Sequence, residues 1–456
     1  MTPSRHQPKG MRTFMIIWVG QVISILGSGL TGFALGVWLY DQTGRATPFA
    51  LTVLFASLPR ILLAPLAGSL ADRWNRRLLM IFADTGAALV TLIAVVLLSS
   101  GQLQIWHVYL ISLSSSIFAA FQEPAYTASI AMLVPKKDLA RANGLVQAAQ
   151  AVEMLVAPLL AGVLFNLIGM RGIFFIDFAT YFFAVGALIM VAIPQPRLSE
   201  EPASGKRGVV WRDVSFGWSY LAARPGLLGL LLYFALVNFF MNLAMVLTGP
   251  LVLAFGSAVT LGAVQMASGV GMLLGSVVMS AWGGPKRRVA GLFGCLAGAG
   301  VGVILTGLQP SGLLVGMGLF LFLLCIPMAS GLSQAVFQTK VAPEVQGRVF
   351  ATRGMISRSI TPVAFLLAGP LADGVFEPLM RTDGGRLAGT VLGRVLGTGT
   401  GRGIGLMFAT SGLLLLAATA AAWTNPRIRN VEDELPDAVT EPDLAPEPAL
   451  LPEPAS

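Results

Sequence analysis

The sequence predicts an all-α integral membrane protein whose twelve transmembrane helices form two six-helix bundles. The first observation is composition: 55% of the residues are hydrophobic and 11% are charged, against roughly 25% charged in an ordinary soluble domain. The second is length, since twelve apolar runs reach the ~18 residues that span a hydrocarbon core of ~30 Å. The third is a polar segment at residues 194–225, which divides these runs six and six.

Helices are expected where the apolar runs begin, near Phe14, Phe49, Leu78, Ile105, Arg141, Ile173, Leu227, Leu261, Val289, Leu313, Val349 and Gly403. The 456 residues leave about 38 for each run, so the loops must be short. The first run is too long for a signal-peptide core and lacks a small-residue cleavage site, so we expect it to be retained. Both cysteines, Cys295 and Cys325, lie inside apolar runs, so we expect no disulfide, metal site or other cofactor.

Composition along the chain suggests four segments. We expect an N-terminal six-helix bundle (1–193), a cytoplasmic central loop (194–225), a C-terminal six-helix bundle (226–425) and a disordered, acidic, proline-rich tail (426–456). From Val431 onward the tail has eight acidic residues and no lysine or arginine, a composition typical of disordered, solvated segments.

The thirty lysines and arginines predict the orientation, because short cytoplasmic loops carry most of the positive charge. With the N-terminus in the cytoplasm, twenty-three fall on that side and six on the other, and Arg60 lies inside a run. We therefore expect a multi-pass protein of the plasma (bacterial inner) membrane with both termini cytoplasmic. The net charge of +8 is then a topology signal and does not indicate nucleic-acid binding.

Similar segments recur in the two halves. LVPKKDLARANGL follows the fourth run and KVAPEVQGRVFAT follows the tenth, about 208 residues later. DRWNRR after the second run is echoed by GGPKRR after the eighth at a similar offset. Such repeats predict two bundles related by an axis along the membrane normal, with a binding site between them near mid-membrane.

Polar residues at helical spacing recur in the first, fourth, seventh and tenth runs, which the repeat makes equivalent. Polar faces within hydrocarbon must contact protein or water, so we expect these four faces to line a shared aqueous cavity. The alternative is that the side chains only form hydrogen bonds between packed helices. The expected cavity residues are Gln21, Ser28, Thr31, Ser116, Glu123, Tyr126, Asn238, Asn242, Gln334 and Gln338.

The first four apolar runs of the second half cannot hold a proton-carrying carboxylate, since no Asp or Glu occurs between Gly226 and Pro343. Desolvation can raise the pKa of a carboxylate by several units, which would let it carry a proton near neutrality. The candidates for proton coupling are Glu153, Glu123, Asp84 and Asp177, with Arg60 as a counter-charge. Each could instead form an interhelical hydrogen bond, and we expect this structural role above all for Asp84 and Asp177.

GSLADRWNRR (residues 68–77) resembles the loop between helices 2 and 3 of the major facilitator superfamily, and the six-plus-six layout agrees over nearly the whole chain. PRILLAPLAGSLADRWNRRLLMIFAD, LVPKKDLARANGL and VAPEVQGRVFATR are similar to the branch that holds macrolide-efflux proteins and the enterobactin exporter. The resemblance implies a latch that joins the cytoplasmic ends of the bundles when the cavity faces outward. Its expected members are Gly68, Asp72, Arg73, Arg76, Arg77, Arg348 and Arg353. The alternative is that these arginines only anchor the topology.

The fifth run resembles the motif G-x8-G-x3-GP-x2-GG of drug–proton antiporters in the same superfamily. The residues at that spacing are Gly144, Glu153, Ala157, Pro158, Ala161 and Gly162. The proline and the first and last glycines are retained, whereas Glu153 replaces one glycine. A carboxylate at this position suggests that the helix does more than pack.

These features favour a secondary active exporter of lipophilic or amphipathic small molecules, such as a drug, a siderophore or another natural product. We expect proton antiport with alternating access, because the chain has no Walker loop to bind a nucleotide. The alternatives are a lipid flippase or importer, an uncoupled facilitator and, with less support, a non-transporting membrane sensor. An enzyme is not expected, because no nucleophile pair or dense polar cluster is present. The expected partners are a small-molecule substrate, protons and membrane lipid, with no nucleic acid, and the protein is expected to be a monomer.

Overall fold

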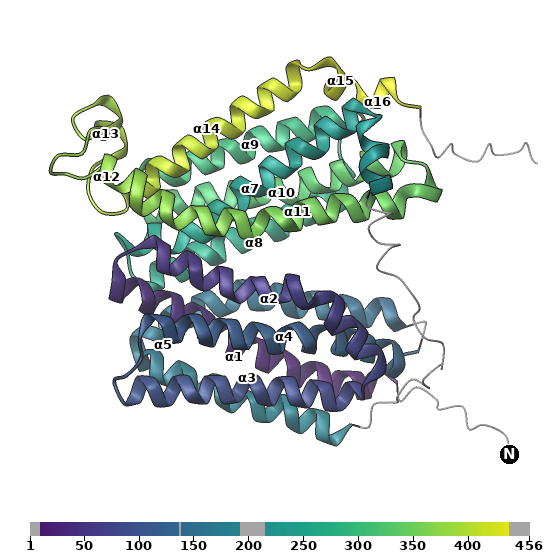
Figure 1. The fold of residues 1–456 in the computed structure, drawn as a ribbon, viewed down its shortest axis with the longest axis vertical. Coiled ribbons are helices and arrows are strands. Elements are labelled where there is room, and N and C mark those ends of the chain that lie inside the picture. Colours follow the sequence, from purple (N-terminus) through teal and green to yellow (C-terminus); the bar gives the residue numbers. More distant parts are fainter. Residues whose placement is uncertain (1–9, 136–137, 192–214, 437–456) are drawn as a thin grey trace, which may run out of the picture.

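The computed structural model describes residues 10–135, 138–191 and 215–436 (Figure 1). Regular structure in these residues is helical throughout. Eleven of the described helices are long and apolar enough to cross a membrane. They are α1 (Met11–Thr43), α2 (Ala46–Arg73), α3 (Arg76–Ser99), α4 (Ile105–Leu133), α5 (Leu139–Met190), α7 (Pro225–Leu253), α8 (Ala258–Trp282), α9 (Arg288–Leu308), α10 (Gly312–Lys340), α11 (Pro343–Leu371) and α14 (Arg402–Thr424).

Helix α5 accounts for the difference between eleven helices and twelve predicted crossings. Its 52 residues would extend for about 78 Å as one straight helix, more than twice the thickness of a hydrocarbon core. The backbone turns back at Gly169, whose φ of 66° and ψ of −179° are open to glycine but strained for other residues. Residues 139–168 and 170–190 are therefore two successive crossings, and the predicted all-α fold of twelve crossings is confirmed.

The crossings form two groups, shown in purple to blue and in teal to yellow in Figure 1. In the first group α1 packs against α5, α2 packs against α4, and α3 packs against both α4 and α5. In the second group α10 packs against α8 and α9, α14 packs against α9 and α7, and α11 packs against α7. The principal contacts between the groups are made by α5 with α8 and by α2 with α11.

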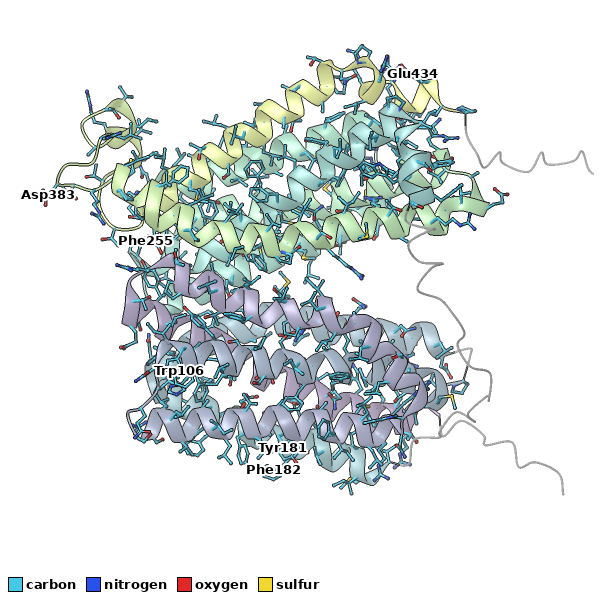
Figure 2. All side chains as sticks on the ribbon, viewed as in Figure 1. Trp106, Tyr181, Phe182, Phe255, Asp383 and Glu434 are labelled. Carbon is cyan, nitrogen blue, oxygen red and sulfur yellow. The ribbon has the colours of Figure 1, made fainter. Side chains whose placement is uncertain are left out.

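The helices begin and end at two opposite ends of the molecule. The basic end holds Arg76, Arg77, Arg287 and Lys340, where α3 and α9 begin and α10 ends. The far end holds Gly44, Gly169 and residues 379–401, which contain the short helix α13 (Val391–Leu396). Figure 2 shows Asp383 at the far end and Glu434 at the opposite extreme of the molecule.

Large apolar side chains cover the outer surface of the helices. Leu167, Phe182 and Met190 are 72%, 60% and 82% exposed, respectively. Phe182 lies on the outer side of the first group in Figure 2. This exposure is the arrangement expected of helices surrounded by lipid.

The last described residues are folded, although we expected disorder from residue 426 onward. Helices α15 (Pro426–Arg429) and α16 (Val431–Glu434) place Ile428 and Val431 in the core of the second group. The carboxylate of Glu432 accepts hydrogen bonds from the backbone N–H groups of Arg288 and Val289, at 3.2 and 3.0 Å, at the start of α9. The apolar residues and this helix cap order a segment that composition alone marks as solvated. The rest of the tail lies outside the described residues.

The end of the expected central loop is also helical, over residues 215–222. Leu221 is fully buried in the core of the second group, and the guanidinium of Arg348 lies 5.0 Å from the centre of the Phe216 ring. This short helix therefore packs against the start of α11. Residues 192–214 of the loop lie outside the described residues.

Candidate functional site: a cavity between the two halves

A cavity of about 700 Å³ lies between the two groups of helices. Helices α1 to α5 form one wall, and α7, α8 and α10 form the other. Of the residues expected to line it, Gln21, Ser28, Thr31, Ser116 and Glu123 do so. Cavities of this volume accommodate drug-sized molecules.

All the charged residues expected in this region line the cavity: Arg60, Asp84, Glu123, Glu153 and Asp177. They all belong to the first half of the chain. Glu153 lies beside Gly29 of α1, where an added Cβ would approach its Oε1 atom to 3.3 Å. Arg60, the expected counter-charge, lines the same cavity, near enough for its positive charge to act on the Glu153 carboxylate.

Asp177 is buried, with 8% of its surface exposed. Its carboxylate accepts hydrogen bonds from Ser28 at 3.3 Å and Thr31 at 2.9 Å, both on α1, and from Thr91 at 3.0 Å on α3. Gly27 lets α1 approach closely, since a Cβ there would collide with the Thr180 hydroxyl. Asp177 thus connects three crossings, an arrangement that supports the structural role expected for it.

Asp84 belongs to a second network that crosses the first half. The Gln21 amide donates to the Asp84 carboxylate at 3.2 Å, and the Gln122 amide donates to the Gln21 oxygen at 2.5 Å. These three side chains come from α3, α1 and α4, respectively. A change in the protonation of Asp84 would therefore alter hydrogen bonds to two other helices of the cavity wall, α1 and α4.

Tyr126 lies beside the cavity, in a smaller side pocket of about 230 Å³ between α1, α4 and the first crossing of α5. The side pocket and the cavity share Gln21, Gln122, Glu123 and Gln150. Within the described part of the chain, the buried hydroxyls of Tyr126 and Ser116 have no hydrogen-bond partner.

Four expected cavity residues, all in the second half, do not line the cavity. Asn238 and Asn242 donate to the carbonyls of Phe234 and Asn238, four residues earlier in their own helix. Gln334 accepts a hydrogen bond from Arg353 at 3.2 Å, and Gln338 is likewise absent from the lining. The amide groups of the two asparagines donate to backbone carbonyls of their own helix. The spacing of residues in the sequence cannot reveal this.

The second half lines the cavity with other residues, which the sequence did not single out. They are Met245, Thr248, Gly249, Leu261, Gln265, Ser268 and Leu319. Gln265 and Ser268 are polar residues three positions apart in the apolar helix α8. Their helical spacing is the same pattern that predicted the other cavity residues, so it could have identified them. This wall is uncharged and mostly apolar.

The motif in the fifth run lies where the two halves meet. A Cβ at Gly262 of α8 would collide with the carbonyl of Pro158, and one at Gly162 of α5 would collide with the carbonyl of Ala258. Ala157 and Ala161 are buried beside them at 2% and 0% exposure, whereas Gly144 has open space around it. Small residues thus bring α5 and α8 into backbone contact.

The described residues of the expected latch make contacts within their own half. Arg76 donates to the carbonyls of Ala71 and Ala128, and Arg77 donates to those of Leu188 and Ile189. In the second half, Arg353 donates to Ser333 at 2.9 Å and lies over the Phe337 ring. A Cβ at Gly68 would meet open space. The side chains of Asp72 and Arg73 lie outside the described residues.

The far end holds a contact between the halves that the sequence did not predict. The Asp373 carboxylate, in the π-helical turn η2 (Ala372–Phe376), accepts hydrogen bonds from the N–H groups of Ala46 and Thr47 at 2.9 and 2.7 Å. The Thr47 hydroxyl adds a third bond at 2.6 Å. Asp373 therefore caps the start of α2 from the opposite half. An acidic residue within an apolar run was the signal that could have identified it.

Two six-crossing halves around a cavity with one charged wall and one mostly apolar wall are the architecture of a membrane transport protein. The family model of the Major Facilitator Superfamily matches residues 17–365, and the chain belongs to this superfamily of transporters. It is a multi-pass membrane protein, and its transport function implies a small-molecule substrate.

The chain is 29% identical over 370 residues to macrolide efflux protein A of Streptococcus pyogenes, covering 79% of this chain and 89% of that protein. It is 27% identical over 319 residues to macrolide efflux protein A of Enterococcus faecalis, covering 68% of this chain and 96% of that protein. The fold is similar to that of a bacterial homologue of the human lysosomal transporter Spinster, solved in an inward-facing and unoccupied conformation. The TM-score is 0.65 at 14% sequence identity, and the match covers 94% of this chain and 98% of that one. This last similarity shows the fold.

Proposed function

We propose that this transporter is a secondary active exporter of lipophilic or amphipathic small molecules, driven by proton antiport. The observation that carries the proposal is the asymmetry of the cavity walls. Four carboxylates and Arg60 line the cavity from the first half, and a mostly apolar, uncharged surface faces them from the second. An amphipathic molecule can contact both walls, and protons can bind to the charged one.

Glu153 and Glu123 are the proposed proton-coupling residues. Their carboxylates line the cavity, and neither accepts the set of three hydroxyl hydrogen bonds that holds Asp177. The macrolide efflux proteins to which the chain is similar support the direction of transport and the substrate class. The plasma membrane location, the cytoplasmic termini and the monomeric state are parts of the same proposal.

Alternating access would require the far end to open and the basic end to close. At the far end the Phe49 ring packs on Gly249, and Asp373 caps α2. At the opposite end, Arg76, Arg77 and Arg353 donate to groups of their own half. This arrangement corresponds to a cavity facing the basic end, which we propose is cytoplasmic. Gly68, Asp72, Arg73 and their basic neighbours would form the latch in the opposite state.

The test is proton movement in liposomes that hold the purified full-length protein and a pH-sensitive dye. The lumen is made acidic, and erythromycin or the lipophilic cation tetraphenylphosphonium is added. We expect wild type to raise the lumenal pH on addition of substrate, and Glu153→Gln or Glu123→Gln to abolish this response. Asp383→Asn, at an exposed far-end position, is the matched control and should behave as wild type.

Substrate flux without proton movement would overturn antiport and indicate a facilitator. If neither compound crosses the liposome membrane in either direction, the proposal that the protein is an exporter is wrong.

A further inference from the structure

The side pocket beside the cavity has features that the general transport function does not require. It lies between α1, α4 and the first crossing of α5, and its volume of about 230 Å³ is several times the ~30 Å³ that one water occupies in the liquid. The two spaces are neighbours, because Gln122 and Glu123 are among the residues that line both.

Tyr126 gives the side pocket an unused polar group. The residue is only 9% exposed, and its buried hydroxyl has no hydrogen-bond partner among the described residues. A buried hydroxyl without a partner is unfavourable by about 1–3 kcal/mol relative to a paired one. A ligand that offers a hydrogen-bonding group would remove this penalty.

The lining of the side pocket determines the charge of such a ligand. Glu123 is the one charged side chain in the described lining, and it is exposed to the pocket and the cavity. The remaining polar groups include the amides of Asn143, Gln147 and Gln150, which both donate and accept hydrogen bonds. One carboxylate among several amides favours a cation that also carries hydroxyl groups.

The length of α4 relates the side pocket to the rest of the substrate. Ser116, whose buried hydroxyl is also unpaired, lines the cavity ten residues before Tyr126. Ten helical residues span about 15 Å, so Ser116 and Tyr126 lie about that far apart along α4. A molecule with a large body and one compact cationic substituent matches this arrangement.

We propose that the side pocket binds a protonated amine carried on a compact hydroxylated ring, such as an amino sugar, while the body of the substrate occupies the cavity. The ammonium pairs with Glu123, and the ring hydroxyls bond to Tyr126 and to the amides of Asn143 and Gln147. This inference rests on the proposed export of amphipathic molecules and adds the chemical group that the protein recognises.

The experiment is equilibrium binding of two ligands to the purified full-length protein in detergent. Erythromycin carries an amino sugar and a neutral sugar, and erythronolide B is the same macrolactone ring without either sugar and with one hydroxyl fewer. We expect wild type to bind erythromycin about tenfold or more tightly than erythronolide B, because a hydrogen bond to a charged group is among the stronger ones. Tyr126→Phe and Asn143→Leu should each weaken erythromycin binding by about three- to tenfold and leave erythronolide B binding unchanged.

The matched control is Tyr109→Phe, which removes a hydroxyl from the same helix away from both spaces. It should bind both ligands as wild type does. Equal wild-type affinity for the two ligands, no binding of either, or parallel weakening of both in the variants would overturn the subsite. Failure of the export proposal is distinct, because tetraphenylphosphonium carries no sugar and its proton-coupled flux does not depend on the subsite.

Discussion

The two halves of the molecule share the same number of crossings but are held together by different interactions. In the first half, side-chain networks around Asp84 and Asp177 join α1, α3, α4 and α5. In the second half, no acidic residue occurs between Gly226 and Pro343, and glycines bring the helices into backbone contact. Gly302 of α9 lies against Gly318 of α10, and Gly307 of α9 lies against Gly405 of α14.

The two kinds of interaction respond differently to pH. A network of carboxylates, amides and hydroxyls changes its hydrogen bonds when a proton is added or removed. Backbone packing between small residues does not depend on pH, because its strength comes from close van der Waals contact. The first half therefore contains the groups whose hydrogen bonds depend on protonation, whereas α7 to α10 are held together by contacts that do not.

The largest expected effect is on the Asp177 network. Asp177→Leu would leave the hydroxyls of Ser28, Thr31 and Thr91 without their acceptor and should lower the free energy of unfolding by about 3 kcal/mol or more. Thermal unfolding of the purified protein in detergent measures the loss. Asp177→Asn is the control, since its carbonyl still accepts, and it should lose less than half as much. A leucine variant as stable as wild type would show that the network does not hold this half together.

Backbone packing in the second half is tested at Gly302. A Cβ there would lie 2.7 Å from the Gly318 carbonyl oxygen and from the Phe322 nitrogen. Gly302→Ala should therefore destabilise the protein by about 1–3 kcal/mol, by the same thermal measurement. Gly294→Ala, on the same helix with open space around it, should be neutral or slightly stabilising. Equal stability of the two variants would contradict close packing as the basis of this half.

The contact between the halves is tested at Asp373. Asp373→Ala removes the cap of α2, which should shift the balance between conformations by about 0.5–2 kcal/mol toward a separated far end. Spin labels at Arg45 and Arg381, both exposed, would report this as a longer or broader distance distribution. Asp383→Ala is the control on the same end. An unchanged distribution in Asp373→Ala would mean that the glycine contacts of α5 with α8 suffice to hold the halves.

The smallest effect is expected at the end of the described chain. Glu432→Gln weakens the cap on α9 and should lower stability by about 0.5–1 kcal/mol, seen as a modest fall in Tm. Glu434→Gln, at an exposed neighbouring position, should leave the Tm unchanged. If the two variants have the same Tm, residues 426–436 add nothing to the second half.

Much of the fold could be predicted because each crossing is a long apolar run. The turn at Gly169 was found as a boundary between two runs, although no loop separates them. The charged residues of the cavity were also found, since Glu153 and Asp177 stand out in an apolar background. The second wall could not be found in the same way: Asn238 satisfies its amide on its own helix, while the apolar Leu261 and Leu319 line the cavity.

Asp373 shows a different limit. Its partners, Ala46 and Thr47, lie 327 and 326 residues away in sequence, and no local pattern relates them. Glu432 is similar, because its neighbours in sequence indicate a solvated tail while its bonds are to the start of α9. In both cases a carboxylate caps a helix that begins elsewhere in the chain, which only the tertiary structure reveals.

The turn at Gly169 also brings a basic side chain to the end of another helix. Between Glu153 and Asp177 the single charged side chain is Arg171, whose guanidinium lies 3.3 and 3.4 Å from the carbonyls of Leu98 and Ser99 at the end of α3. The hairpin of the fifth and sixth crossings therefore has one charged side chain near its tip and no loop. The negative end of the α3 dipole stabilises that charge. A helix that comes earlier in the chain thus holds the tip of a hairpin that has no loop of its own.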